Sequence, residues 1–539
     1  MVIKHIIVLL FLIFQYSSAK VTYNVVTLGA KADGRSDTKN AFLKAWNLAC
    51  ASTSPAIIAV PSGRYLIASA ITFSGQTCKS KAITFNMYGT LVAPSSYNAI
   101  GNDEVWIKFY RVNHVTISGG TLDAQGGPLW ACKSSGKTCP QGATTLGIYH
   151  SQNIVISKLR SLNSQMFHIA VYACTNTKLQ GVSIVASGLS PNTDGIHLTS
   201  STGITILNSK ISTGDDCISI GPGNSNVWIE KVVCGPGHGI SIGSLGWELQ
   251  EAGVQNITVK TTTFIGTQNG LRIKTWARRS NGFVRNIVFK GATMMKVKYP
   301  IIIDGKYCPN NRNCPNDQVS GVKISNVAFE NVHGTSATQV AVKFDCSKGS
   351  PCSGIRLKDV SLVYVGKPAI SSCSYAAGTA SGILLPSSCF IGSLGWELQE
   401  VGVQNITVKT TTFIGTQNGL RIKTWARRSN GFVRNIVFKD ATMMKVKYPI
   451  IIDGKYCPNN RNCPNDQVSG VKISNVAFED VHGTSATQVA VKFDCSKGSP
   501  CSGIRLKNVN LVYVGKPAIS SCSYAAGTAS GILLPSSCL

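Results

Sequence analysis

The residues of this chain best suited to chemistry are acidic and basic side chains that follow one another through the middle of the sequence. They are Asp194, Asp215, Asp216, His238, Arg272 and Lys274. Paired carboxyl groups are what glycoside hydrolysis needs, because one protonates the leaving oxygen while the other activates water or attacks the sugar. Crowding of like charges raises the pKa of one carboxyl group, which keeps a proton available for the acid role. The two cations are suited to binding substrate carboxylates, so the set predicts hydrolysis of an acidic polymer.

A metal site is the competing interpretation of the same cluster, since hard cations bind carboxylate oxygens. Arg272 and Lys274 argue against it, because positive side chains beside the acids oppose a second positive charge. We therefore expect no metal and no cofactor.

A short repeated phrase, Asn or Gly followed by an apolar or β-branched residue, predicts how these side chains are positioned. It occurs at Asn153-Ile154, Asn176-Thr177, Gly203-Ile204, Asn226-Val227, Asn256-Ile257, Asn286-Ile287, Gly321-Val322 and Gly354-Ile355. Each phrase opens a short alternating strand, and periods of ~20–50 residues built from strands and turns indicate a solenoid. We predict an all-β fold, a right-handed parallel β-helix. A β-propeller is the alternative, but its blades need four strands each and more even spacing.

Successive coils of such a solenoid stack the candidate residues. One coil later in sequence lies ~4.8 Å higher in space. Asp215 and His238 each lie 11 residues after the apolar residue of their phrase, so we expect them on one outer wall. Asp194 joins them if its coil carries an extra loop. Asp216 also faces outward only if the strand departs from alternation there, whereas Arg272 and Lys274 are two residues apart and share a face.

Two segments near the N-terminus, residues 1–19 and 37–50, have different sequence patterns. Residues 1–19 have a basic start, a short apolar run and small residues at Ser17, Ser18 and Ala19, which predicts a secretory signal peptide. The run is too short for a membrane anchor. Residues 37–50 have helical spacing at Ala41, Phe42, Ala45 and Trp46, which predicts a short helix capping the exposed end of the stack.

The C-terminal half of the chain is a duplication. Residues 242–390 recur as residues 391–539, with 143 of the 149 positions identical. A tandem duplication and an error of gene assembly leave the same pattern. We predict three parts: a signal peptide at 1–19, a complete unit at 20–390, and a partial unit at 391–539. The partial unit keeps Arg421, Lys423 and Tyr456 but has no counterpart of the three acids at positions 194, 215 and 216 or of the histidine at position 238.

The composition narrows the class of protein. Hydrophobic residues make up 43% and charged residues 14%, which excludes a disordered chain. The net charge of +28 comes from 52 basic and 24 acidic residues, and the duplication counts part of it twice. Such a charge suits a polyanion, and no nucleic-acid-binding motif accompanies it.

Four of the motifs, taken in order, resemble the signature motifs of plant polygalacturonases, the pectin-cleaving enzymes of glycoside hydrolase family 28. They are Asn192-Thr193-Asp194, Gly214-Asp215-Asp216, Gly237-His238-Gly239 and Arg272-Ile273-Lys274, and the resemblance extends over residues 25–389.

The resemblance implies roles for individual residues. Asp215 corresponds to the general acid that protonates the departing galacturonate oxygen. Asp194 and Asp216 correspond to the pair that activates water and gives inversion, and His238 to the histidine that supports the acid. The expected substrate-binding residues are Asn192, Gly239, Arg272, Lys274 and Tyr307. Family members commonly carry Gln where this chain has Gly305, so the chain departs from the pattern beside Tyr307.

The expected protein is a secreted, extracellular hydrolase of demethylated pectin in the cell wall, monomeric, with no nucleic-acid or membrane partner. Rhamnogalacturonan hydrolysis is a related alternative. An alternative of a different class is a non-catalytic, pectin-binding or allergen-like wall protein inactivated by the duplication. The sequence does not distinguish endo from exo cleavage.

The 19 cysteines are expected to form disulfides in an oxidising compartment. Closeness in sequence and in coil position suggests the pairs Cys50–Cys78, Cys132–Cys139, Cys217–Cys234, Cys308–Cys314, Cys346–Cys352 and Cys373–Cys389, with three equivalent pairs in the duplicate. Cys174 is left over and is expected to be a buried thiol.

Overall fold

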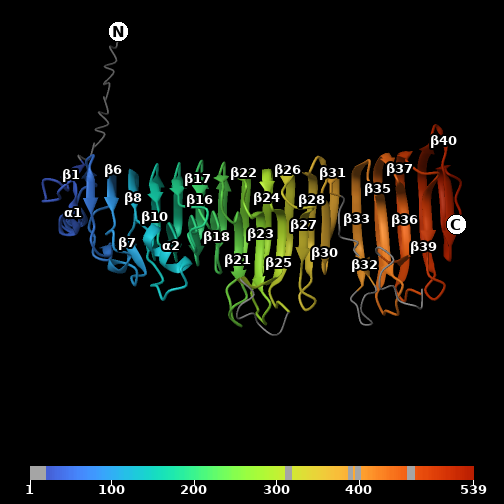
Figure 1. Ribbon diagram of the computed structural model, residues 1–539, viewed down its shortest axis with the longest axis horizontal. Helices are drawn as coiled ribbons and strands as arrows, with labels where there is room; N and C mark the ends of the chain where they lie inside the picture. The colour runs from blue at the N-terminus through green and yellow to red at the C-terminus, as the bar shows by residue number, and fades with distance from the viewer. Residues whose placement is uncertain (1–19, 310–318, 387–392, 395–401, 458–467) are drawn as a thin grey trace, which may run out of the picture.

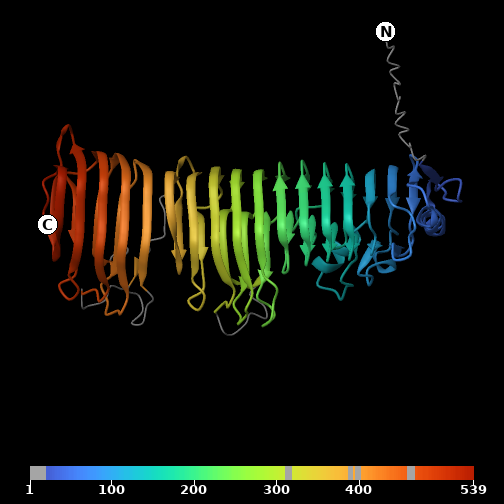
Figure 2. The ribbon, with the colours of Figure 1, turned by 180° about the vertical axis from the view of Figure 1, so that it is seen from behind.

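The chain winds into an elongated parallel β-helix, as the sequence predicts (Figures 1 and 2). The computed structural model describes residues 20–309, 319–386, 393–394, 402–457 and 468–539. The predicted signal peptide therefore lies outside the described residues. None of the helices in the described ranges is long and apolar enough to cross a membrane.

Three sheets form the walls of the solenoid in the part that the structure describes. Sheet 1 contains β1 (Val21–Asn24), β2 (Asp33–Asp37), β3 (Ala56–Val60), β4 (Arg64–Leu66), β6 (Ile83–Val92), β8 (Val115–Asp123), β10 (Gln152–Ser157), β11 (Arg160–Leu162), β13 (Thr175–Gln180), β14 (Ser183–Val185), β16 (Thr202–Leu207), β17 (Lys210–Ser212), β19 (Ser225–Glu230), β20 (Val233–Cys234), β22 (Val254–Ile265), β24 (Phe283–Val297), β26 (Lys323–Ser336), β28 (Cys352–Tyr364), β29 (Lys367–Pro368), β31 (Ala376–Leu385), β33 (Val403–Ile414), β35 (Phe432–Val446), β37 (Lys472–Ser485), β39 (Cys501–Tyr513), β40 (Lys516–Pro517) and β42 (Ala525–Leu534).

Sheet 2 contains β5 (Ile71–Ser74), β7 (Val105–Tyr110), β9 (Thr144–Tyr149), β12 (Ile169–Tyr172), β15 (Ile196–Thr199), β18 (Ile218–Ile220), β21 (Ile240–Leu245), β23 (Asn269–Trp276), β25 (Tyr299–Tyr307), β27 (Val340–Asp345) and β30 (Ile370–Ser374). Sheet 3 contains β32 (Ser393–Leu394), β34 (Asn418–Trp425), β36 (Tyr448–Tyr456), β38 (Val489–Asp494) and β41 (Ile519–Ser523).

The repeated phrase sets the register between coils. In sheet 1 its second residues pair in one row: Ile154, Thr177, Ile204, Val227, Ile257, Ile287, Val327 and Ile355. All are buried and form one line of the core. The asparagine before them adopts a positive φ, as at Asn226 (55°) and Asn256 (58°). Asn and Gly tolerate this left-handed conformation better than other residues, which explains their choice at this position.

One phrase is displaced from its predicted place. The residue paired with Ile287 is Val327, preceded by Asn326, and not Val322 as the sequence suggests. Asn326 also continues the ladder of asparagine side chains, because its Nδ2 donates to Asn286 Oδ1 at 2.7 Å. Gly321-Val322 and Asn326-Val327 both match the phrase, so the pattern alone misplaces the row by five residues.

The capping helix is confirmed as α1 (Lys39–Ala51), which buries Ala41, Phe42, Ala45 and Trp46. The Trp46 ring lies 5.4 Å from that of Phe73, so the helix closes the first coils with an aromatic cluster. Two further helical segments are not predicted from the sequence: the 3₁₀ helix η1 (Tyr97–Ala99) and α2 (Gly127–Ser134).

Four of the six disulfides predicted before the duplicate are present, namely Cys50–Cys78, Cys132–Cys139, Cys217–Cys234 and Cys346–Cys352. Cys308 and Cys373 are also disulfide-bonded, and their predicted partners, Cys314 and Cys389, lie outside the described residues. The duplicate forms Cys495–Cys501 and Cys522–Cys538, and Cys457 is bonded too. Cys174 is buried and free, as expected.

The duplicate continues the solenoid on one wall. β31 pairs with β33, for example Ala380 with Val408, so sheet 1 runs through the junction. On the opposite wall sheet 2 ends at β30 and sheet 3 begins at β32. β22 pairs directly with β19, so the first copy completes the coils that carry the acids. The duplicate ends in β42, the last strand of the stack, whose residues are mostly exposed.

Stacked phenylalanines in the two copies allow a matched test of stability. Phe329 lies 5.0 Å from Phe289, and its counterpart Phe478 lies 5.0 Å from Phe438. Both side chains are fully buried, so each Phe→Ala change is expected to cost about 3–5 kcal/mol. Because solenoid coils contact mainly their neighbours, Phe478→Ala should lower protection in the C-terminal coils alone. Hydrogen exchange followed by mass spectrometry checks this, and a uniform loss of protection along the chain would contradict it.

Candidate active site

Asp215 and Asp216 lie in a bend between β17 and β18, not within a strand. The expected departure from strand alternation is therefore present. The Asp216 backbone N–H donates to Asp215 Oδ1 at 2.7 Å, which fixes the bend. Asp216 is almost fully buried, with 1% of its side chain exposed, whereas the Asp215 side chain is 20% exposed. The two neighbouring carboxylates thus occupy different environments.

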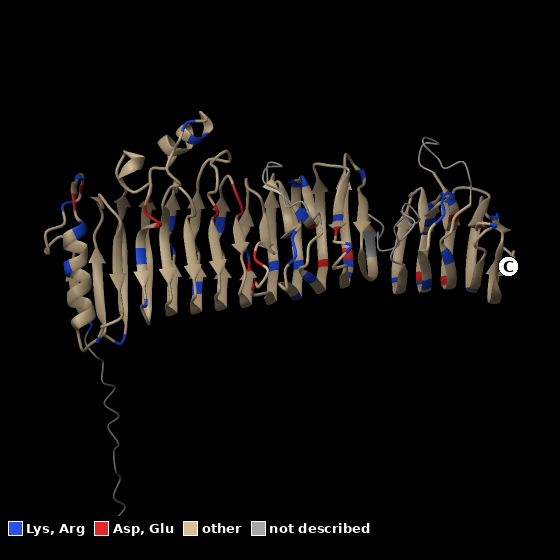
Figure 3. Ribbon diagram, turned by 90° about the horizontal axis from the view of Figure 1, so that it is seen from below, with Lys and Arg blue, Asp and Glu red and all other residues tan. Residues whose placement is uncertain are grey.

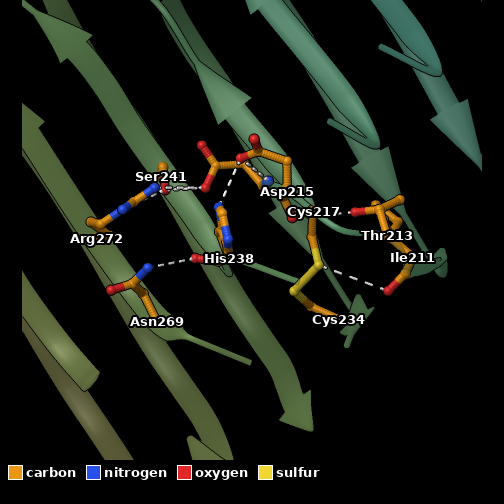
Figure 4. The surroundings of a disulfide bond; sticks show 10 residues. Ile211, Thr213, Asp215, Cys217, Cys234, His238, Ser241, Asn269 and Arg272 are labelled. Atoms are coloured by element: carbon orange, nitrogen blue, oxygen red, sulfur yellow. Dashed lines mark hydrogen bonds and ion pairs between the residues drawn. A yellow bond between two sulfur atoms is a disulfide. The ribbon is translucent and has the colours of Figure 1, made fainter. Parts of the chain in front are cut away.

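His238 lies on the next coil, directly against Asp215. Its backbone N–H donates to the Asp215 carbonyl oxygen at 2.8 Å, and its Nδ1 lies 2.9 Å from Asp215 Oδ1. Asn269 Nδ2 donates to the His238 carbonyl oxygen and holds the far side of this turn. The disulfide Cys217–Cys234 joins the two coils beneath the pair, as predicted (Figure 4). The predicted stacking of Asp215 and His238 is present.

Asp194 lies one coil before Asp216. The N–H of Gly195 donates to the Asp216 carbonyl oxygen at 2.9 Å, which places the two coils side by side. The Asp194 carboxylate accepts a 2.6 Å hydrogen bond from Ser219 Oγ and lies 3.3 Å from His197 Nδ1. Burial raises the pKa of Asp194, the His197 hydrogen bond opposes this, and the charges of Asp215 and Asp216 add to the rise.

Asp216 is surrounded by donors. Its Oδ1 accepts hydrogen bonds from Ser241 Oγ (2.8 Å) and Arg272 Nη2 (2.9 Å). Its Oδ2 accepts one from Lys274 Nζ at 2.8 Å. Burial opposes ionisation of this carboxyl group, but Lys274 and Arg272 outweigh burial and hold its pKa at about 2. Asp216 is therefore ionised at mildly acidic and neutral pH.

The contact of Arg272 and Lys274 with Asp216 is a difference from the sequence analysis, which assigned both cations to the substrate. Each residue is 7% exposed. Spacing along the chain predicts a shared face for the two cations but does not show that a carboxylate two coils away lies between them. Their first structural role is to stabilise the Asp216 anion.

The remaining predicted residues take different positions. Tyr307 lies over the cations, with its ring centroid 4.9 Å from Lys274 Nζ and 5.8 Å from Arg272 Cζ. Asn192 is exposed on the loop before Asp194. Gly239 is buried, and a Cβ there would lie 2.2 Å from the Asn269 carbonyl oxygen. Gly239 thus contributes close backbone packing beside His238.

The sequence analysis missed three polar residues of the site: His197, Ser219 and Ser241. They pair in one row of sheet 2 that continues to Arg272. A signal was present, because each lies three residues after a predicted site residue, at positions 194, 216 and 238. The His197 ring stacks on the Phe167 ring, with centroids 4.3 Å apart, and its Nδ1 faces Asp194.

The alternative of a metal site depends on how close the possible ligand atoms of Asp215, Asp216 and His238 lie to one another. One side-chain oxygen each of Asp215 and Asp216 and a ring nitrogen of His238 lie within 4.8 Å of one another, close enough to share an ion. Both oxygens of Asp216, however, already accept hydrogen bonds from cationic side chains. This donor set disfavours a further cation at Asp216.

A groove borders the site. It has a volume of about 480 Å³ and passes His238, Gln268, Lys296, Lys298 and Thr338. The two lysines give the groove a positive wall next to the acids, an arrangement that attracts an anionic ligand.

Comparison with known proteins places this fold and site in a family. The family described as "Glycosyl hydrolases family 28" matches residues 50–382 and 388–531. The chain is 60% identical over 384 residues to a polygalacturonase of Prunus persica, covering 71% of this chain and 97% of that protein. It is 43% identical to an exopolygalacturonase of Platanus acerifolia, covering 69% and 98%. The chain therefore belongs to glycosyl hydrolases family 28.

Solved structures agree on the fold. The endo-xylogalacturonan hydrolase from Aspergillus tubingensis superposes with a TM-score of 0.59 at 23% identity, covering 68% of this chain and 100% of that one. A polygalacturonase from Erwinia carotovora ssp. carotovora has a TM-score of 0.51 at 24% identity, covering 66% and 95%.

The charge balance at Asp216 makes a stability prediction. Asp216→Asn leaves two buried cations without their counter-charge, which is expected to cost about 3–5 kcal/mol in the free energy of unfolding. The control is Asp345→Asn, whose partner Lys343 is 3.8 Å away and 43% exposed. That surface pair is expected to contribute at most about 1 kcal/mol. Urea unfolding of both variants measures the difference, and equal losses would contradict the assigned charge balance.

Proposed function

We propose that the protein is a polygalacturonase that hydrolyses α-1,4-galacturonosidic bonds of demethylated pectin. The observation that carries the proposal is the meeting of Asp194, Asp215, Asp216 and His238 beside a groove with a lysine wall. Membership of the family and the 60% identity to a polygalacturonase support it.

Asp215 is the proposed general acid. Of the two carboxyl groups in the bend, Asp215 is more exposed than Asp216. Its Oδ1 lies 2.9 Å from His238 Nδ1. A protonated Asp215 donates its proton to the glycosidic oxygen, and the hydrogen bond to His238 orients the group and supports its return to the acid form.

Asp216 and Asp194 are the proposed pair that activates water. The pKa of about 2 keeps Asp216 ionised and able to accept a proton or hydrogen bond from water. Asp194 lies on the adjacent coil, and its pKa is raised. The pair therefore combines one carboxyl group of low pKa, Asp216, with one of raised pKa, Asp194. Attack by the held water on the anomeric carbon, with departure of the protonated oxygen, inverts the configuration.

Substrate binding is proposed for Arg272, Lys274, Tyr307, Asn192 and Gly239. The cations hold Asp216 and have further N–H donors for a galacturonate carboxylate, while the Tyr307 ring offers a face to a sugar. Lys296 and Lys298 extend the positive surface along the groove.

The proposed setting is the extracellular cell wall, with the protein acting as a monomer on pectic polysaccharide and binding neither nucleic acid nor membrane. The disulfides support an oxidising compartment. One similar protein is named an endo-xylogalacturonan hydrolase and another an exopolygalacturonase, so the proposal covers both endo and exo action.

Reducing-end release from polygalacturonate at mildly acidic pH tests the function. Residues 20–539 should be active, and Asp215→Asn should lower kcat by at least ~100-fold, because general acid catalysis contributes roughly 10²–10⁴-fold. Proton NMR of the first product should show the inverted anomer. A folded wild-type chain that binds the polymer without releasing sugar would instead support the non-catalytic wall protein.

The pKa of Asp194 predicts the acidic limb of the pH dependence. If Asp194 must be ionised to accept a hydrogen bond from water, activity rises as pH rises through its elevated pKa. Removing the His197 hydrogen bond, which lowers that pKa, should raise it further. His197→Leu is therefore expected to move the acidic limb of kcat/KM to higher pH.

The control for this shift is His333→Ala, an exposed histidine on sheet 1 that contacts Thr293. The acidic limb of kcat/KM for His333→Ala should coincide with that of the wild type. An unchanged limb in His197→Leu, or a shift to lower pH, would remove Asp194 from the water-activating pair.

A further inference from the structure

The duplicate retains the cations of the active site without the acid that holds them. Arg421 and Lys423 are the counterparts of Arg272 and Lys274, and Tyr456 is the counterpart of Tyr307. Nothing in the duplicate corresponds to Asp216. Identical side chains therefore meet different surroundings in the two copies.

Arg421 pairs with a different acid from its counterpart Arg272. Its Nη2 donates to Asp453 Oδ2 at 2.8 Å, whereas Arg272 donates to Asp216. The Arg421 Nε is buried and has no hydrogen-bond partner among the residues that the structure describes, while the Arg272 Nε donates to Ser241 Oγ. A buried N–H without an acceptor is unfavourable, so this guanidinium is less well satisfied than its counterpart.

Lys423 is left as a charge without an ion pair in the described part of the chain. Its counterpart Lys274 is bound to Asp216 at 2.8 Å. Lys423 Nζ lies 4.6 Å from the centroid of the Tyr456 ring, and Arg421 Cζ lies 5.0 Å from the same ring. Burial and the nearby Arg421 lower the pKa of Lys423, and the charge of Asp453 offsets this only in part.

The duplicate's cations are also more accessible. Arg421 and Lys423 are partly exposed, whereas Arg272 and Lys274 are buried. Arg421, Lys423 and Asp453 together carry one net positive charge beside an aromatic face. A carboxylate on a sugar ring satisfies both features, because it supplies the missing anion and an apolar face for Tyr456.

We propose that Arg421, Lys423 and Tyr456 form a second, non-catalytic site that binds a uronate of the polysaccharide. The identity of the polymer rests on the proposed function. Pairing of β22, β24, β26, β28, β31 and β33 places the two sites five coils apart. At one strand spacing per coil this is ~24 Å. Basic residues occur on the coils along the solenoid, including those of the duplicate (Figure 3).

A polymer that reaches both sites gains from the second contact, because that contact is intramolecular. A short oligouronide that fills only the active site gains nothing. The second site therefore raises the affinity for the polymer and leaves hydrolysis of short oligomers unchanged.

Binding is measured with the full chain carrying Asp215→Asn, so that the polymer is not cut. Affinity electrophoresis in gels containing polygalacturonate compares this parent with the added pair Arg421→Ala and Lys423→Ala. Loss of two charge-assisted contacts is expected to weaken binding roughly tenfold. The matched control, Arg434→Ala with Lys472→Ala, removes two exposed charges from sheet 1 of the same copy and should change binding less than about twofold.

Equal binding of the parent and the double variant overturns the proposal. So does an equal loss in gels containing dextran sulfate, which would indicate general attraction of polyanions. If the double variant fails to fold, Lys423→Gln carries the test with an expected loss of roughly threefold.

The proposed function is tested separately with wild-type Asp215. Release of reducing ends from short oligouronides should be the same with and without Arg421→Ala and Lys423→Ala. A wild-type chain that releases no sugar, while its binding still depends on Arg421 and Lys423, would refute the hydrolase and support the second site. Slower oligouronide hydrolysis in the double variant would overturn the assignment of the second site as non-catalytic.

Discussion

In-register stacking of parallel coils is the constraint on which the rest of this structure depends. Each coil places a residue one strand spacing from its equivalent in the next, so buried aliphatic residues form continuous rows. The same geometry gathers side chains that are distant in sequence: His197, Ser219, Ser241 and Arg272 follow one another along a single row. The core and the active site thus both result from the same stacking of coils.

Electrostatics then divides the acids that stacking brings together. Asp216 is ionised because Arg272 and Lys274 approach it from later coils, although burial alone would keep it neutral. Asp194, on the earlier coil, has no such cations and its pKa is raised. The duplicate shows the converse: without the acid, Arg421 pairs with Asp453, and Lys423 forms no ion pair with the residues that the structure describes. Position along the stack, more than residue type, sets the behaviour of each charge.

The sequence predicted those features that repeat. The phrase spacing gave the solenoid and the meeting of Asp215 with His238, and helical spacing gave α1. It failed at Val327, because two neighbouring segments match the phrase and the pattern does not show which of them enters the row. It also missed His197 and the contact of Arg272 with Asp216, since such contacts depend on side-chain length and burial, which spacing does not contain.

β31 and β42 have the same amino-acid sequence, yet β31 lies inside the stack and β42 ends it. The same segment therefore packs against a following coil in one copy, whereas in the other it has no later neighbour in sheet 1 among the described residues. Because the strand at the join needs no change of sequence, a duplication within the gene can lengthen the solenoid in steps of whole coils. The outer wall of the stack grows in this way before any new residue is selected.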